Sequence, residues 1–568
     1  MNKIIFLIFL LLNYVLNVET YENSHTLVLN DGESKIDEVK LTQTPNFGVS
    51  IHDGENIIHY EKEYADTSGY GSATEENEKH SKEDCNKEKL VKISEPGTYI
   101  VSGSLKGQLS VELSSKTEST QIVTLVLNSI DIKCTVAPGL IFYKAYEIDS
   151  TEYEDTGTAI TYQTANNLNF NNAGAKIIIA DDSTNTVTGS HVAKCFKYTL
   201  NDDGSITMTT EKRAKYDGAF YSKVSMYIKG ETKGNGKLNI IADNEGLDTE
   251  KHLLIESGYI NIASQDDGIN TNEENGSVTL IKGGTVTINA GLGSEGDGID
   301  SNGYLIINGG TVITAAKPAS DSGMDADLGV VINGGIVVGT GSTMDGASSS
   351  STQPTMNLKF SSQISKNSKL VIKNSSGNTI LTFSPSSSGF VENTDIRTYQ
   401  GAIISHPSFK LNEVYYLYLD DIQLGYNGQG GQNMPGNPQD NNNGNPGDLP
   451  DNGGQNNGNP PDNGEQNNNN NPGNPPDNGE QNNNNNPGNP PNNEGINNNQ
   501  QINIGSMSKE FTLTSTATTF SGISTYSESS SSTDSEITQS DDTTKKKSLG
   551  TYIGYSLGNL LSLLIIIL

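Results

Sequence analysis

Carboxylate side chains recur at fixed places in a short phrase that the chain repeats four times between residues 242 and 342. The phrase is an acidic or polar residue, then Gly, an apolar residue, and Asp or Asn. Its copies are Glu245–Asp248, Asp267–Asn270, Asp297–Asp300 and Ser322–Asp325. Carboxylate and carbonyl oxygens presented on loops are the ligands that a hard divalent cation such as Ca²⁺ prefers. The residue types therefore favour cation binding, provided that the fold brings the copies together.

The spacing of the phrase indicates which fold does so. Its glycines are 22, 30 and 25 residues apart, and the Gly-Gly pairs at 283, 309 and 334 are 26 and 25 residues apart. Periods of this size are typical of solenoids. The runs between them are short and rich in Val, Ile and Thr, which is strand composition. We therefore predict an all-β fold, a single-stranded parallel β-helix, with glycines at its corners. A β-sandwich with regular turns is the alternative.

Stacked coils place equivalent residues above one another. Two carboxylates about 5 Å apart repel by roughly 1 kcal/mol in water and about 3 kcal/mol at a protein surface. Between residues 243 and 345 there are 16 Asp and Glu residues but three Lys and no Arg. We therefore predict bound Ca²⁺. Its candidate ligands are Glu245, Asp248, Asp266, Asp267, Asn270, Asp297, Asp300, Asp321, Asp325 and Asp327. The alternative is that these carboxylates cap turns and face solvent.

The corner phrases, the run Asp217–Lys223 and the segment Gly236–Ile240 resemble the secreted carbohydrate-binding domain-containing family. That family is a calcium-binding, right-handed parallel β-helix, similar in fold to pectate lyases, and it binds plant cell-wall polysaccharide. The resemblance extends from Lys89 to Leu424. It implies a right-handed coil, calcium as cofactor and a plant cell-wall polysaccharide as partner.

The composition limits the partners further. The chain has 568 residues, a formal net charge of −32 and two arginines. This charge disfavours nucleic acid and anionic membrane surfaces, and favours cations, neutral polymers or acidic polymers bridged by cations. We expect a monomer whose contact with a membrane is through a C-terminal anchor.

The chain divides by composition into seven segments. Residues 1–20 read as a signal peptide and 21–88 as an acidic, partly disordered lead-in. The β-helix spans 89–345, and a small β cap spans 354–424. An Asn/Gly/Pro-rich disordered linker covers 425–505, a Ser/Thr-rich stalk 506–544, and a GPI signal or membrane anchor 545–568. These segments predict a secreted protein held at the cell surface or in the cell wall.

Catalysis is the main alternative to binding. A calcium-dependent lyase needs an Arg or Lys base beside the acidic cluster, and the regular repeats contain no Arg. A hydrolase built on the carboxylates of Asp297 and Asp300 stays open. We predict non-catalytic, calcium-assisted binding of an acidic pectic glycan or cellulose. A lyase or glycoside hydrolase of the same polymers, and a structural wall protein or adhesin, are the alternatives.

Further candidate sites come from single residues. The chain has no Trp, so Tyr221, Tyr259 and Tyr304 are the candidates for stacking on sugar rings. Asn275 and Asn374 begin glycosylation sequons. Of the three cysteines, Cys134 and Cys195 could pair in an oxidising compartment.

Overall fold

The computed structural model of the chain is almost entirely β-structure, as predicted. It describes residues 21–58, 82–189, 196–200, 206–212, 216–318, 320–342, 345–391, 395–431 and 507–527. Its α-helices are single turns: α3 (Lys82–Cys85), α4 (Tyr153–Thr156) and α5 (Tyr162–Asn166). Within these ranges, no helix has the length and apolarity to cross a membrane. The predicted signal peptide (1–20) and anchor (545–568) lie outside the described residues.

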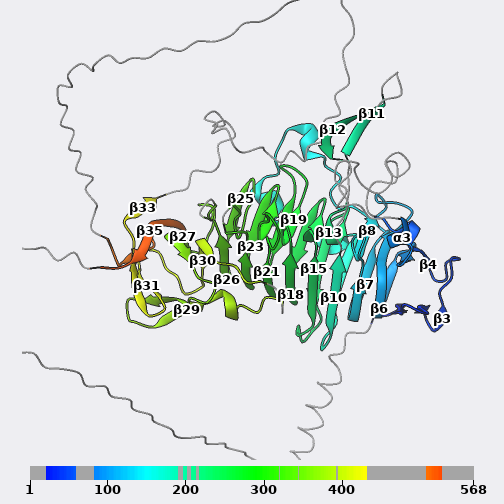
Figure 1. Cartoon of the computed structure of the whole chain (residues 1–568), viewed down its shortest axis with the longest axis horizontal. Coiled ribbons are helices and arrows are strands. Elements are labelled where there is room, and N and C mark those ends of the chain that lie inside the picture. Colours follow the sequence, from blue (N-terminus) through cyan, green and yellow to red (C-terminus); the bar gives the residue numbers. More distant parts are fainter. Residues whose placement is uncertain are drawn as a thin grey trace, which may run out of the picture. The chain divides into compact units, whose positions relative to one another are not determined.

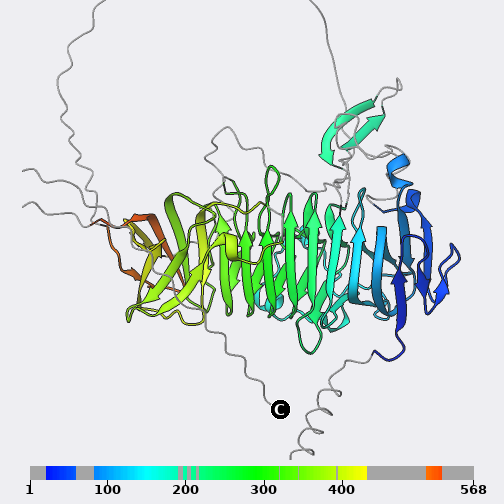
Figure 2. The same cartoon turned by 60° about the horizontal axis from the view of Figure 1, so that its bottom comes forward.

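The repeats form rungs of three short strands, and each strand pairs in parallel with its equivalent one rung later (Figure 1, Figure 2). The first regular rung is β13 (Gly218–Ser222), β14 (Met226–Gly230) and β15 (Lys237–Ala242). The second is β16 (Glu245–Thr249), β17 (His252–Ile255) and β18 (Tyr259–Ser264). The third is β19 (Ile269–Thr271), β20 (Val278–Ile281) and β21 (Thr285–Asn289). The fourth is β22 (Ile299–Ser301), β23 (Tyr304–Ile307) and β24 (Thr311–Ala315), followed by β25 (Gly329–Ile332) and β26 (Ile336–Gly341). This is a solenoid of parallel strands, while its right-handed winding stays a prediction.

Aliphatic ladders fill the solenoid. Leu247 lies opposite Ile269, which lies opposite Ile299, and all three side chains are fully buried. A second ladder from Leu238 to Val312 crosses four rungs in the same way. Side chains of a strand alternate between the two faces of its sheet. The residues next to these ladders in the sequence therefore point out of the solenoid.

Glycines permit the corners in two ways. A Cβ on Gly268 would lie 2.1 Å from Cγ2 of Ile288 and 2.5 Å from the carbonyl oxygen of Gly298, so the corner phrase has no room for a side chain. In the Gly-Gly pairs the second glycine has a positive φ, at 81° for Gly284 and 85° for Gly310. That conformation strains any L-residue with a side chain.

The N-terminal part of the chain is also built into this solenoid. Strands β1 (His25–Leu29), β2 (Lys35–Ile36), β3 (Val39–Lys40) and β4 (Val49–Asp53) precede β5 (Lys89–Ile93), β6 (Gly97–Glu112), β7 (Val123–Lys133), β8 (Leu140–Lys144), β9 (Ala175–Ile179) and β10 (Thr184–Gly189). Strand β1 pairs in parallel with β6, and Leu27 and Ile36 are fully buried. Over residues 21–58 the predicted lead-in is therefore a folded first layer, because its few apolar residues alternate with polar ones.

A segment between β8 and β9 covers one side of the rungs. It carries α4, α5 and a 3₁₀ turn at Phe170–Asn172. Phe170 and Ile160 pack against outward residues of β17, β20 and β23 in one hydrophobic cluster. The Asn166 side chain accepts a hydrogen bond from Asn308 (2.8 Å) on the fourth rung. The side formed by β14, β17, β20, β23 and β25 is thus occupied by the chain itself.

The C-terminal end is closed by mixed strands. They are β27 (Thr355–Ile364), β28 (Leu370–Asn374), β29 (Thr379–Phe383), β30 (Tyr399–Ser405), β31 (Val414–Leu419), β32 (Ile422–Gly425), β33 (Gly428–Gly431), β34 (Phe511–Thr512) and β35 (Ala517–Thr525). Strand β30 pairs antiparallel with β26 and ends the parallel ladder.

Strand β35 corrects the predicted Ser/Thr-rich stalk. It pairs in parallel with β27, and Phe511, Phe520 and Ile523 are buried in the cap core. Tyr426 and Ser508 exchange two main-chain hydrogen bonds of 2.9 Å, so the chain returns to the cap after the Asn-rich tract. The stalk thus cannot begin at residue 506, because residues 507–527 complete the cap. The tract from 432 to 506 and the chain after 527 lie outside the described residues.

Candidate functional site

An outward face of the solenoid carries the repeated carboxylates. Strands β16, β19 and β22 point Leu247, Ile269 and Ile299 into the core, so their neighbours in sequence point outward. Asp248 lies opposite Asn270, and Asn270 lies opposite Asp300. Asp325 continues this series, because its N–H donates to the carbonyl oxygen of Ile299 (2.8 Å). We call Asp248, Asn270, Asp300 and Asp325 the strand file.

A second series, the corner file, comprises Glu245, Asp267, Asp297 and Ser322. The N–H of Asp297 donates to Oδ1 of Asp267 (2.6 Å), and the N–H of Ser322 donates to Oδ1 of Asp297 (2.5 Å). The N–H of Gly268 donates to the carbonyl oxygen of Asp297 (2.9 Å). Asp267 and Asp297 are therefore vertical neighbours, as the repeat spacing predicted. Together the two files form the acidic face.

Burial and mutual repulsion disfavour the ionised form of the carboxyl groups on the acidic face. Burial raises the pKa of Asp297 to about 8 and that of Asp300 to about 7, with further increases from the charges of neighbouring aspartates such as Asp325. Burial likewise raises the pKa of Asp325 to about 6. The pKa values of Asp248 and Asp267 lie well above the usual range, first through burial and then through nearby carboxylates. Without a counter-ion, the face therefore favours protonated carboxyl groups at neutral pH.

Lysines do not supply that counter-charge within the described part of the chain. No described lysine, arginine or histidine forms an ion pair with Asp267, Asp297 or Asp300. Lys251 instead pairs with Glu273 (2.5 Å) and Glu152 (3.6 Å). Nζ of Lys317 donates to the carbonyl oxygen of Gly293.

The hydrogen bonds of Asn270 show whether the oxygen atoms of the acidic face suit a metal ion. Its Nδ2 donates weakly to Glu245 (3.3 Å) and Asp267 (3.5 Å), while its Oδ1 is buried without a hydrogen-bond partner. A buried, unused oxygen among carboxylates fits an oxygen-ligated cation such as Ca²⁺. Among the residues that the structure describes, no three His, Cys, Asp or Glu side chains converge at metal-binding geometry. The fit is thus one of donor chemistry rather than of a preformed cage.

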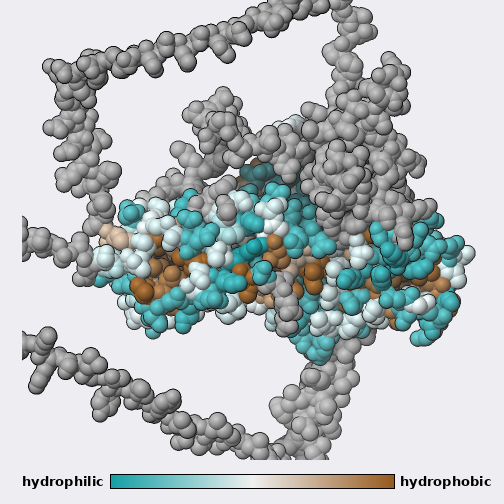
Figure 3. Space-filling model, viewed as in Figure 1, coloured by the Kyte–Doolittle hydropathy of each residue, from teal (hydrophilic) through white to brown (hydrophobic). Residues whose placement is uncertain are grey.

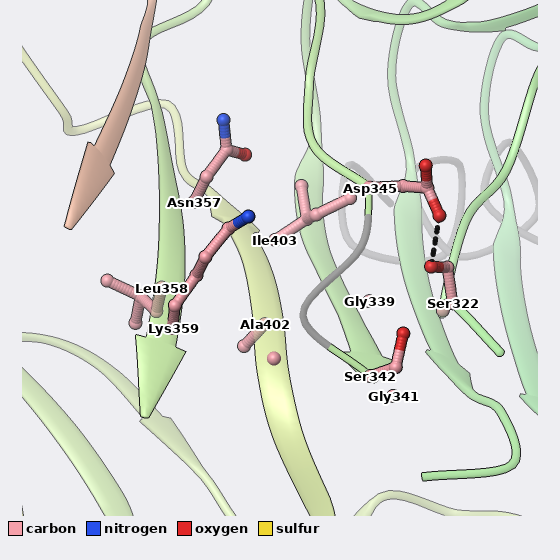
Figure 4. A pocket seen from close by; sticks show the side chains of 12 residues that line it. Ser322, Gly339, Gly341, Ser342, Asp345, Asn357, Leu358, Lys359, Ala402 and Ile403 are labelled. Atoms are coloured by element: carbon pink, nitrogen blue, oxygen red, sulfur yellow. Dashed lines mark hydrogen bonds between the residues drawn. The ribbon is translucent and has the colours of Figure 1, made fainter. Parts of the chain in front are cut away.

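Asp345 adds a carboxylate that the corner phrase does not predict. It lies after β26, accepts a hydrogen bond from Oγ of Ser322, and raises the pKa of Asp325 (Figure 4). A small pocket begins here, between the last rung and β27 and β30 of the cap. Lys359 lines its far wall. Asp345 was missed as a ligand in the sequence analysis because it is not part of a corner phrase. It follows β26, the strand after the last Gly-Gly pair.

The remaining predicted ligands lie around these files. Asp266 raises the pKa of Asp267, and Asp321 accepts a hydrogen bond from the N–H of Gly296 (2.9 Å). Asp327 is exposed and adds to the electrostatic strain at Asp300. The structure thus brings all ten predicted ligands to one side of successive rungs.

A family model describes this part of the chain. Residues 149–384 match the model of the family "carbohydrate-binding domain-containing protein". The match contains every residue of both files and confirms the resemblance found in the sequence. Among curated proteins, none matches the chain significantly.

A solved structure is also similar to the chain. It is described as a polysaccharide lyase-like protein from C. thermocellum, in a gadolinium derivative. It is 20% identical, and the alignment covers 55% of this chain and 92% of the other at a TM-score of 0.30.

The three tyrosines predicted to stack on sugar rings have different surroundings. Tyr221 was predicted to stack on sugars, but it is 3% exposed, lies 4.7 Å from Tyr216, and donates to Glu250 (2.8 Å). Distant residues, such as Ile58, cover it, so it is not a surface platform. Tyr304 is half-buried against Tyr162 of the covering segment. Tyr259 is 41% exposed and stays a candidate.

The two sequons also differ in setting. Asn275 lies in a turn with φ of 59°, and Ser277 is buried and donates to the carbonyl oxygen of Thr271 (2.8 Å). Asn374 ends β28 at a turn, where Ser375 and Ser376 are exposed. Glycosylation stays a prediction at both.

The cysteines do not show the predicted bridge. Cys134 is a free, buried thiol that donates to Glu88 (3.1 Å), and Cys85 is also free and buried. Cys195 lies outside the described residues.

Proposed function

We propose that the acidic face binds Ca²⁺ and, through it, an acidic cell-wall polysaccharide. The observation that carries this proposal is the vertical stacking of Asp267 on Asp297 and of Asn270 on Asp300, with no described cationic side chain between them. The match of residues 149–384 to the model of the carbohydrate-binding domain-containing family supports a polysaccharide as the ligand.

Two groups of oxygen donors would hold the ions. Glu245, Asp267 and Asn270 form the first, and Asp297, Asp300 and Asp325 form the second. A bound calcium ion would neutralise the stacked charge and leave coordination positions for carboxylates of a uronic-acid polymer. The protein's contribution is the spacing of the donors, which the parallel pairing fixes at about 4.8 Å per rung.

Binding without cleavage agrees with the position of the described arginine. Nη2 of Arg397 donates to the carbonyl oxygen of Gly291, beyond the end of β21, and is thus engaged by the main chain. The N–H of Gly291 donates to the carbonyl oxygen of Asp266 (3.1 Å). Arg213 lies outside the described residues. We propose a secreted, surface-anchored monomer with a right-handed coil, on the sequence features given above.

The test is retention of the purified protein on immobilised polygalacturonate, with calcium or with EGTA. We expect retention in calcium, release in EGTA, and loss of retention in the double variant Asp267→Asn, Asp297→Asn. Asp131→Asn, an exposed carboxylate on β7, is the matched control. Retention that ignores EGTA would contradict the calcium role, and accumulation of unsaturated or reducing products would establish an enzyme instead.

A further inference from the structure

A different face of the same rungs carries amides and hydroxyls where the acidic face carries carboxylates. It is formed by β10, β15, β18 and β21. Its central outward residues, Thr186, Asn239, Asn261 and Thr287, lie opposite one another in register across four strands. Nδ2 of Asn261 donates to Oδ1 of Asn239 (2.9 Å), and Oγ1 of Thr287 donates to Oδ1 of Asn261. We call this the neutral face.

These hydrogen bonds fix the orientation of the two amides. Each amide has two N–H donors and an oxygen that accepts two hydrogen bonds. Asn261 therefore retains one N–H, and Asn239 retains both, after the bonds within the series are made. Side chains held by their neighbours present such donors at low entropic cost to a ligand.

Tyr259 stands beside this series. It begins β18, lies between Lys237 and Thr285 in register, and is 41% exposed. Ile241, near the end of β15, is 37% exposed. A large exposed ring next to oriented polar groups is the combination that ligand sites use for a partly apolar, hydroxylated ligand. On the surface this region shows small brown patches among teal and white residues (Figure 3).

The chain itself forms a wall at one end of this face. Asn289 is fully buried, and its Nδ2 donates to the carbonyl oxygen of Asp395 (2.7 Å). Arg397 holds the same segment against Gly291. The later strand β24 is partly covered, since Ile313 packs against the cap core. The accessible area is thus a platform on β10, β15 and β18 that ends in a step at β21.

We propose that this platform binds an extended, uncharged polysaccharide without calcium. Its outward residues include no carboxylate from β10 to β21, and Lys237 is their one charged member. A uronic-acid polymer would meet no cation-binding oxygens here, whereas hydroxyl groups of a neutral pyranose chain match amide and hydroxyl partners. The rung repeat of ~4.8 Å offers equivalent groups at regular steps along such a chain. The proposal rests on the proposed carbohydrate binding, but on a face separate from the calcium ligands.

The test is depletion of the full-length protein from solution by insoluble cellulose in EGTA. We expect Tyr259→Ala to weaken binding about five- to tenfold, the loss typical of removing a central contact residue. Tyr259→Phe, which keeps the ring, should bind like the parent. Ile422→Ala removes another exposed apolar side chain, on the cap, and serves as the matched control.

The two faces can be tested separately. The Asp267→Asn, Asp297→Asn variant should keep cellulose binding and lose retention on polygalacturonate, and Tyr259→Ala should do the reverse. Cellulose binding that is absent in the parent, or unchanged by Tyr259→Ala, would overturn the neutral-face proposal. Retention on polygalacturonate in calcium does not depend on the neutral face. Failure of the neutral-face proposal and failure of the calcium proposal are therefore separate results.

Discussion

The acidic and neutral faces are made by the same backbone and differ in what the parallel register stacks. On the acidic face, Asp267 lies against Asp297 and Asn270 against Asp300. On the neutral face, Asn239, Asn261 and Thr287 form a chain of hydrogen bonds. The members of the neutral series hydrogen-bond to one another, whereas the acidic series accumulates charge.

The difference shows that main-chain pairing does not depend on side-chain charge. The ladders on both faces have the same parallel geometry, and both are held by aliphatic files inside the solenoid. Burial of these files stabilises the rungs strongly enough to tolerate repulsion outside. A side-chain series that opposes folding without a ligand is a sign of a binding site.

The largest loss of stability is expected from removing β34 and β35. These strands belong to the cap that closes the solenoid carrying both faces. Truncation after residue 431 removes Phe511, Leu513, Phe520 and Ile523, all buried. Each buried side chain of this size is worth about 1.5–3 kcal/mol, so we expect an unfolded or protease-sensitive cap. Circular dichroism melting and limited proteolysis would show it.

The matched control is an internal deletion. Replacing residues 433–505 by a short Gly/Ser linker keeps Tyr426 bonded to Ser508. This variant should melt like the parent. Equal melting of the truncated chain would show that β34 and β35 contribute little to the cap.

The sequence predicted the rungs because its repeats carry the register with them. Each rung repeats the same corner phrase, so Asp267 lies under Asp297 although the copies are 22, 30 and 25 residues apart. The cap strand β35 was hidden by composition, since Phe520 and Ile523 stand within a Ser/Thr-rich segment. Tyr221 was misjudged because Ile58 and Ile141, which pack in the same cluster, come from distant parts of the chain. Local pattern fixes which face a side chain occupies, but not what covers that face.

The next largest effect is expected at a corner between the two faces. Gly268→Ala places a Cβ 2.1 Å from Ile288 and 2.5 Å from the carbonyl oxygen of Gly298. Overpacking of this kind costs about 1–3 kcal/mol, measured by urea unfolding. Gly377→Ala is the control, because φ there is 82° but no atom lies within 4 Å of the added Cβ. A Gly268→Ala loss no larger than the Gly377→Ala loss would contradict the close packing of the corner.

A smaller effect is expected from pH in the absence of calcium. The ordinary pKa of 3.8 is raised in the folded state to about 8 at Asp297 and about 7 at Asp300. Between the ordinary pKa and the raised values, folded molecules therefore bind more protons than unfolded ones. The free energy of unfolding thus falls as pH rises from about 4 to 8. Melting temperatures in EGTA should decline across this range, and calcium should flatten the decline at its upper end. A melting temperature that rises with pH in EGTA would contradict the raised pKa values.

The smallest change in the free energy of unfolding is expected from two variants, one that removes a charge from the acidic face and one that adds a charge to the neutral face. At pH 8 in EGTA, Asp267→Asn removes one of the stacked carboxylates and keeps an oxygen for the N–H of Asp297. It should raise the free energy of unfolding by about 1 kcal/mol. Asn261→Asp removes the N–H that bonds to Asn239, and should lower the free energy of unfolding by a similar amount. Urea titrations of both variants measure the two signs under one condition. Changes of the same sign would show that the faces do not differ in electrostatic balance, since the comparison requires removal of charge to stabilise one face and its addition to destabilise the other.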